Sequence, residues 1–215
     1  MERGWVGRID GEHVIHLAAQ TLQAFFTGGG AREHAVYPLD AIRLLAPVLH
    51  PPTVRVFEDQ ASFEFANPAA IVGPDAEIRV LGEELVLVPR LAAVIGAEGA
   101  LDGFTAFAEW RLPVAPPPKD RDFALGLGPI VITPDEFDPR PREVVVRVDG
   151  DDLLRTKLDA FDWEAARGHA AAGTTLRPGD LLAGPAAGAV TVEPGAAVEL
   201  EIDGIGVLGH TVLRD

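Results

Sequence analysis

The sequence predicts an α+β fold that is mainly β, with a core of mixed, rolled sheets and a small N-terminal lobe. Short runs in which apolar and polar residues alternate recur along the chain, and this period of two is typical of strands. The 215 residues include 23 glycines and 18 prolines, which favour many turns and short strands over long helices. Hydrophobic residues make up 47% of the chain, enough for one sizeable core.

Composition excludes several classes of function. The formal net charge is −15 and the pI is about 4.7, so the surface repels phosphate backbones and we expect no nucleic-acid partner. The chain has no cysteine, which excludes disulfides and thiolate chemistry. The first residues contain no long apolar run, so we expect neither a signal peptide nor a membrane span. We therefore expect a cytoplasmic location.

The first 52 residues are predicted to form the small lobe. Trp5 to Leu17 alternates around Asp10-Gly11, a pair favoured in tight hairpin turns. Leu17 to Phe26 has helical apolar spacing and is followed by three glycines. Pro51-Pro52 then marks a boundary, and we assign residues 53–215 to the core domain.

Four charged residues interrupt the apolar runs between Leu85 and Glu136. Arg90, Glu109, Arg111 and Arg121 occur in segments that read as buried strands. Burying such groups is costly unless they are paired or line a polar pocket. This segment is therefore the candidate site.

Several motifs in and around this segment resemble the fumarylacetoacetate hydrolase family. They are the runs LAAVIG from Leu91, GFTAFAEWRLP from Gly103, KDRDFALGLGPIVITPDEF from Lys119 and LRPGDLL from Leu176. The resemblance extends over nearly the whole chain. It implies a mixed β-sheet roll or barrel and a class of enzymes that cleave, decarboxylate or isomerise oxo-acids with Mg²⁺ or Mn²⁺.

The positions at which the family holds its metal are changed in this sequence. The family pattern places carboxylates as E-x-E on one strand, where both point to the same face, and adds an Asp from the next strand. Here these positions are Val88, Arg90 and Glu109. Since a guanidinium group repels a nearby cation, we predict no metal at these residues and no cofactor.

Other family positions are altered as well. The lid that carries a catalytic His and Glu in relatives looks deleted, and we interpret Glu58, Asp59 and Glu64, which remain there, as solvated loop residues. The family's substrate-facing lysine aligns with Arg121, with Lys119 two residues before it. A strand through this segment would place both side chains on one side.

Two functions remain open. In the first, the protein is a non-catalytic homologue, a pseudoenzyme that forms a homodimer or a heteromer with an active paralogue. In the second, it is a metal-independent enzyme for a small anionic oxo-acid. Arginines, with Arg111 or Lys119 assisting Arg90 and Arg121, would then replace the divalent cation, and Glu109 would be the acid or base. We favour an internal Arg90–Glu109 salt bridge over a catalytic pair.

Overall fold

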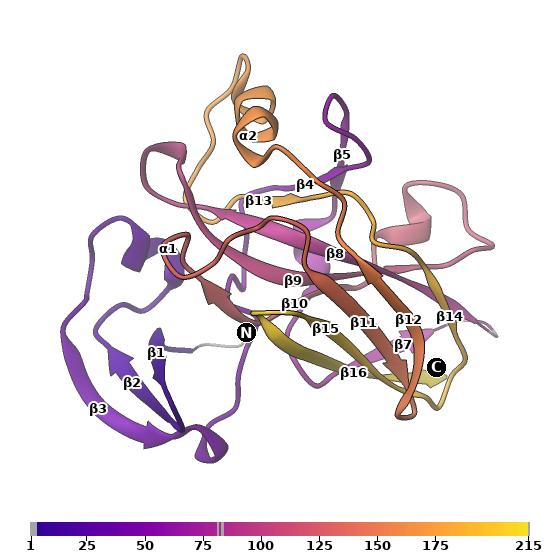
Figure 1. Ribbon diagram of the computed structural model, residues 1–215, viewed down its shortest axis with the longest axis horizontal. Coiled ribbons are helices and arrows are strands. Elements are labelled where there is room, and N and C mark those ends of the chain that lie inside the picture. Colours follow the sequence, from indigo (N-terminus) through magenta and orange to yellow (C-terminus); the bar gives the residue numbers. More distant parts are fainter. Residues whose placement is uncertain (1–3, 81, 83, 215) are drawn as a thin grey trace.

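The computed structural model describes residues 4–80, 82 and 84–214, and strands dominate this part of the chain (Figure 1). The strands form three sheets, two of which pack together as a curled core. The prediction of a mainly β fold with a rolled core of mixed sheets is confirmed, because both large sheets contain parallel and antiparallel pairs.

The N-terminal segment forms the smallest sheet, drawn in indigo and violet at one side of Figure 1. Its strands follow the order β1 (Gly7–Asp10), β2 (His13–Leu17) and β3 (Glu33–Pro38). The predicted hairpin is present, and Gly11 adopts a φ of +58° in its turn. Helix α1 (Leu22–Phe26) is shorter than predicted because Leu17 completes β2 and Thr21 caps the helix. The domain boundary at residue 52 stays a prediction.

An eight-stranded sheet forms the centre of the molecule. Its order is β5-β4-β13-β8-β9-β10-β6, and β14 also pairs with β8. The strands are β4 (Val54–Phe57), β5 (Phe63–Ala66), β6 (Ile71–Val72), β8 (Leu85–Ile95), β9 (Leu101–Arg111), β10 (Leu125–Ile132), β13 (Leu181–Ala183) and β14 (Val190–Val192). The long antiparallel strands β8 and β9 lie next to each other in the middle of this sheet.

The third sheet has five strands in the order β12-β11-β15-β16-β7. Its members are β7 (Ala76–Val80), β11 (Glu143–Val148), β12 (Asp151–Lys157), β15 (Ala197–Ile202) and β16 (Gly206–Arg214). Helix α2 (Trp163–Ala171) lies at the top of Figure 1, at the opposite end of the molecule from the turn that joins β11 and β12. Asp162 caps its first turn. No helix in the described part of the chain is long and apolar enough to cross a membrane.

The eight-stranded sheet is covered on both faces, and the alternation of β8 and β9 separates two apolar clusters. Leu91 and Trp110 belong to the cluster that packs against the five-stranded sheet. Ala92 and Phe107 belong to the opposite cluster, which includes Val48 from the last part of the predicted small lobe. Both strands are therefore almost entirely buried, as a sheet with two covered faces requires.

Candidate functional site

The register of β8 and β9 determines which charged side chains meet. Val88 lies directly opposite Glu109, and Val86 lies opposite Arg111. Arg90 lies two residues beyond Val88 and thus projects from the same face of the sheet. The prediction that Val88, Arg90 and Glu109 share one face therefore agrees with the observed register.

Arg90 and Glu109 form a fully buried ion pair. Both side chains are 0% exposed, and Arg90 Nε donates to Glu109 Oε2 at 2.7 Å. Arg90 Nη1 donates to the carbonyl oxygens of Phe57 and Gly184 at 3.0 and 2.9 Å, and Nη2 donates to Glu58 Oε1 at 2.9 Å. These additional hydrogen bonds offset the cost of taking the guanidinium group out of water.

Arg111 binds the second oxygen of Glu109. Its Nε donates to Glu109 Oε1 at 2.9 Å, and its Nη2 donates to Glu58 Oε1 at 3.2 Å. Partial burial acts to lower the pKa of Arg111, but the charges of Glu109 and Glu58 together with their hydrogen bonds raise it overall. Arg111 is therefore a permanently charged bridge between the two carboxylates.

Arg121 approaches the same carboxylate from another element. It belongs to a short 3-10 helix (Lys119–Arg121), which is joined to the end of β9 by a hydrogen bond from the Leu112 amide to the Asp120 carbonyl. Its Nη1 lies 3.4 Å from Glu109 Oε1 and 3.1 Å from Glu64 Oε2. The residue is only 8% exposed, yet Nε and Nη1 form no hydrogen bond with the described residues.

Lys119 does not join this group. Its side chain is exposed and binds Asp122, with Nζ 3.1 Å from Oδ1. The expectation that a strand places Lys119 and Arg121 on one side is wrong, because residues 119–121 form a 3-10 helix. Three residues complete a 3-10 turn, so side chains two positions apart diverge.

The sequence analysis missed two acidic partners. Glu58 and Glu64, interpreted there as solvated loop residues, form ion pairs with the arginines from the two sides of the β4–β5 loop. Asp59, between them, does serve the loop: its Oδ1 accepts hydrogen bonds from the Ala61 and Ser62 amides. These bonds, with that of the Ser62 hydroxyl, lower the pKa of Asp59. The available signal for Glu58 and Glu64 was that three candidate arginines, Arg90, Arg111 and Arg121, had only one candidate acid, Glu109, to balance their charge.

We call Arg90, Arg111 and Arg121 the arginine cluster. Three guanidinium groups converge there on Glu109, and each also contacts a carboxylate of the hairpin. Such a cluster is suited to holding carboxylates through charge-assisted hydrogen bonds. Both oxygens of Glu109 are engaged by guanidinium groups, so this residue acts as the fixed counter-charge of the cluster.

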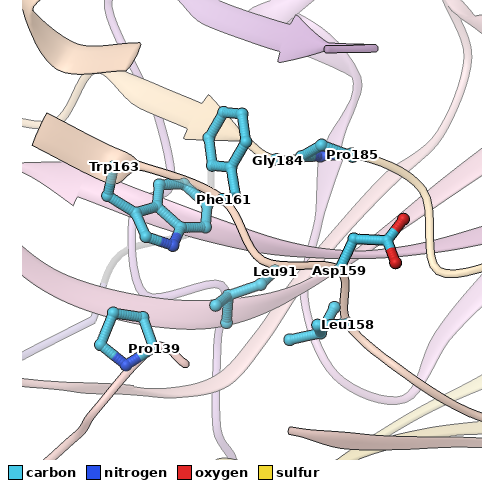
Figure 2. Close-up of a pocket in the computed structure, with 8 residues that line it drawn as sticks. All are labelled: Leu91, Pro139, Leu158, Asp159, Phe161, Trp163, Gly184 and Pro185. Atoms are coloured by element: carbon cyan, nitrogen blue, oxygen red, sulfur yellow. The ribbon is translucent and has the colours of Figure 1, made fainter. Parts of the chain in front are cut away.

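Two grooves lie on another side of the same strands. The smaller is lined by Leu91 and Gly184 and by the rings of Phe161 and Trp163, which lie next to each other in Figure 2. The other has a volume of about 350 Å³ and is lined largely by apolar side chains, among them Phe104. Neither lining includes a member of the arginine cluster, but the smaller groove adjoins it through Gly184, whose carbonyl oxygen accepts a hydrogen bond from Arg90.

Comparison with known proteins identifies the family. A family model described as "Fumarylacetoacetate (FAA) hydrolase C-terminal" matches residues 48–213. The chain belongs to the fumarylacetoacetate hydrolase family. A curated relative, "Protein Rv2993c" of Mycobacterium tuberculosis, is 29% identical over 83% of this chain and 81% of its own length.

Solved structures of lower sequence identity share the family's fold. A maleylpyruvate hydrolase from Sphingobium sp. SYK-6, in complex with manganese(II) ion and pyruvate, matches with a TM-score of 0.79 and 21% identity, covering 98% of this chain and 96% of its own. A 2-keto-3-deoxy-D-arabinonate dehydratase, complexed with magnesium and 2,5-dioxopentanoate, matches with a TM-score of 0.80 and 18% identity, covering 99% and 95%.

These comparisons overturn the prediction that no cofactor is used. The two structural relatives hold manganese and magnesium, so a divalent metal ion is the cofactor that the family indicates. The side chains at Val88, Arg90 and Glu109 do not match an oxygen ligand set, because one is apolar and one is a guanidinium group bound to the third. Within residues 4–80, 82 and 84–214, no group of three or more His, Cys, Asp or Glu side chains is placed to hold a metal ion.

Proposed function

We propose that the protein binds a small oxo-acid anion at the arginine cluster and is a non-catalytic member of its family. The observation that carries the binding proposal is Arg121. Its guanidinium group is almost fully buried, and Nε and Nη1 have ion-pair contacts with Asp120, Glu64 and Glu109 at 3.1–3.6 Å but form no hydrogen bond with the described residues. Buried charged donors are normally hydrogen-bonded, so Arg121 is suited to donate to a ligand carboxylate that takes the place of one of the protein carboxylates around the cluster.

The chemistry of the ligand follows from the cluster. Guanidinium groups bind planar carboxylates through paired hydrogen bonds, and an oxo-acid adds a carbonyl oxygen as a further acceptor. The two structural relatives were solved with pyruvate and with 2,5-dioxopentanoate, both of which carry an oxo group and a carboxylate. Pyruvate is accordingly the probe of choice.

The burial and the hydrogen bonds of Glu109 support the proposal that the protein is non-catalytic. A general base must reach a proton of its substrate, at a heavy-atom distance of about 3 Å. Glu109 is 0% exposed, and its two oxygens accept hydrogen bonds from Arg90 and Arg111. Its carboxylate is thereby committed to the ion-pair network.

Calorimetric titration with pyruvate, performed with and without Mn²⁺, tests the binding proposal. The wild-type protein should bind, and Arg121→Ala should lose most of the affinity while it keeps its melting temperature within a few degrees. The matched control is Arg155→Ala, since Arg155 pairs with exposed Glu143 and Asp152 on the five-stranded sheet. Absence of wild-type binding in both buffers, or equal affinity for Arg121→Ala, would refute the proposal.

A second candidate function is an enzyme for small oxo-acids, which is favoured by the activities for which the two structural relatives are named, a hydrolase and a dehydratase. The assay is cleavage or isomerisation of an acylpyruvate followed by ultraviolet absorbance in the presence of Mn²⁺. Turnover that disappears in Glu109→Gln would establish this function and would reject the non-catalytic proposal.

The remaining expectations concern assembly and location. We propose a homodimer or a heteromer with an active paralogue. Light scattering after size-exclusion chromatography gives the molar mass of the purified protein and so tests the homodimer directly. A cytoplasmic location stays a prediction from the composition.

A further inference from the structure

We propose that Glu58 is a displaceable internal carboxylate that occupies a ligand's position at the arginine cluster, so that the β4–β5 hairpin inhibits binding until Glu58 moves away. This inference rests on the proposed binding of an oxo-acid and goes beyond it, because it concerns how access to the cluster is controlled. The argument uses the geometry of Glu58, the charge balance of the cluster and the attachment of the hairpin.

The contacts of Glu58 are those that a bound carboxylate would make. Its Oε1 accepts hydrogen bonds from Nη2 of Arg90 at 2.9 Å and from Nη2 of Arg111 at 3.2 Å. Two arginines from neighbouring strands thus converge on one oxygen. The Arg90 side chain is not exposed to solvent. An external anion can therefore contact Arg90 only at the position that Glu58 occupies.

The charge balance excludes simple addition of another anion. The three guanidinium groups already lie within 4 Å of four carboxylates, those of Glu58, Glu64, Glu109 and Asp120. A further carboxylate would be repelled, in a protein whose net charge is −15. A ligand therefore binds only if one of these four carboxylates leaves.

Burial identifies the carboxylates that can leave. The Glu109 side chain is 0% exposed and that of Asp120 is 12% exposed, so neither can turn outward without rearranging the sheet or the 3-10 helix. The Glu58 and Glu64 side chains are 49% and 64% exposed and reach solvent by rotating. Of these two, Glu58 binds two arginines and directly covers Arg90.

A side chain at the tip of the hairpin that carries Glu58 joins this tip to α2. Gln60 Nε2 donates to the Asp162 carbonyl at 2.8 Å, and the Asp162 amide donates to Gln60 Oε1 at 3.0 Å. This pair of bonds joins the tip to the start of α2, next to which the hairpin stands in Figure 1. At the base, Phe57 is fully buried, so the strand stays in place while the tip can open.

The test compares pyruvate affinities of single variants by calorimetry. Glu58→Gln keeps an amide oxygen for the two arginines but removes the competing charge, and it should lower the Kd at least tenfold. Gln60→Ala leaves every charge of the cluster in place and releases the tip, and it should lower the Kd several-fold. Glu77→Gln is the control, since Glu77 is a similarly exposed partner of an arginine on β7, away from the cluster.

The outcomes separate this inference from the function on which it rests. If the wild type binds pyruvate and Glu58→Gln binds with equal or lower affinity, the inference is overturned and the proposed function stands. If neither the wild type nor Glu58→Gln nor Gln60→Ala binds, both fail. Should Glu58→Gln not fold, an unchanged Kd in Gln60→Ala overturns the inference.

Discussion

At the scale of single residues, the buried centre is a network of arginines and carboxylates in which each group has several partners. Arg90 is held by two carboxylates and two carbonyl oxygens, and Glu109 has a guanidinium donor at each oxygen. Each partner is buried only because the others are present. Substitutions at this centre therefore test the network more than any single contact.

Replacing Glu109 with Ala should destabilise the fold by about 3–5 kcal/mol, because Arg90 would keep a buried charge without its main partner. Urea denaturation followed by circular dichroism measures the change. The double variant Arg90→Met/Glu109→Leu should recover much of the loss, since apolar residues of similar volume replace both charges. An unchanged midpoint for Glu109→Ala would mean that the pair contributes little.

A close approach at Gly126 offers a second test at this scale. A Cβ atom on Gly126 would lie 2.3 Å from Cε1 of His210 and 3.0 Å from Cβ of Ala108. Gly126→Ala should therefore cost about 1–3 kcal/mol of stability through overpacking. Gly168→Ala is the control: Gly168 lies within α2 with open space around it, and the change should stabilise by about 0.5–1 kcal/mol. Equal melting temperatures for the two variants would contradict this reading.

At the scale of elements, the sequence was sufficient to predict which side chains meet where their positions depend on strand alternation. Arg90 and Glu109 could be placed together because the period of two fixes the faces of β8 and β9. Glu58 and Glu64 could not be placed, since the path of the β4–β5 hairpin over the cluster is set by distant contacts such as Gln60 with Asp162. Arg121 lies on a 3-10 helix after three prolines, where alternation does not apply.

Strand β16 carries a buried group that makes stability depend on pH. Burial lowers the pKa of His210 to about 4, although a hydrogen bond with the backbone of Gly73 acts in the opposite direction. The unfolded chain takes up the proton near pH 6.5, before the folded chain does, so the free energy of unfolding decreases as the pH falls from about 6.5 to about 4. Above pH 6.5 this contribution is constant.

The decrease due to His210 should reach up to about 3 kcal/mol, the equivalent of the difference between the two pKa values. Urea denaturation between pH 7 and pH 4 measures it. His210→Gln should have a flatter profile across this window, whereas His13→Gln, in the exposed part of the small lobe, should keep the wild-type slope. Parallel profiles for wild type and His210→Gln would contradict the assignment.

At the scale of the whole molecule, the last part of the predicted small lobe packs into the core. Ala46 and Val48 are buried in the cluster that covers one face of the eight-stranded sheet. The sequence analysis located the lobe from its hairpin and its prolines, but packing between segments far apart in the chain has no local signature. The domain boundary at residue 52 stays a prediction, and the stability of fragments tests it.

A fragment of residues 53–215 should be less stable than a fragment of residues 43–215, because it exposes the apolar surface that Ala46 and Val48 cover. We expect a melting temperature lower by several degrees and greater aggregation, measured by scanning calorimetry and light scattering. Adding Val48→Ala to the longer fragment should produce part of the same loss. Equal melting temperatures for the two fragments would show that residue 52 is an independent boundary.

Strand β13 has a consequence for the order in which the protein can assemble during synthesis. This strand, Leu181–Ala183, lies between β4 and β8, and the carbonyl oxygen of the following Gly184 binds Arg90. The β4–β5 hairpin is thus joined to β8 through a segment that leaves the ribosome more than a hundred residues later. Non-local pairing of this kind slows folding. Arg90 therefore lacks its Gly184 acceptor on the nascent chain until this segment has been synthesised.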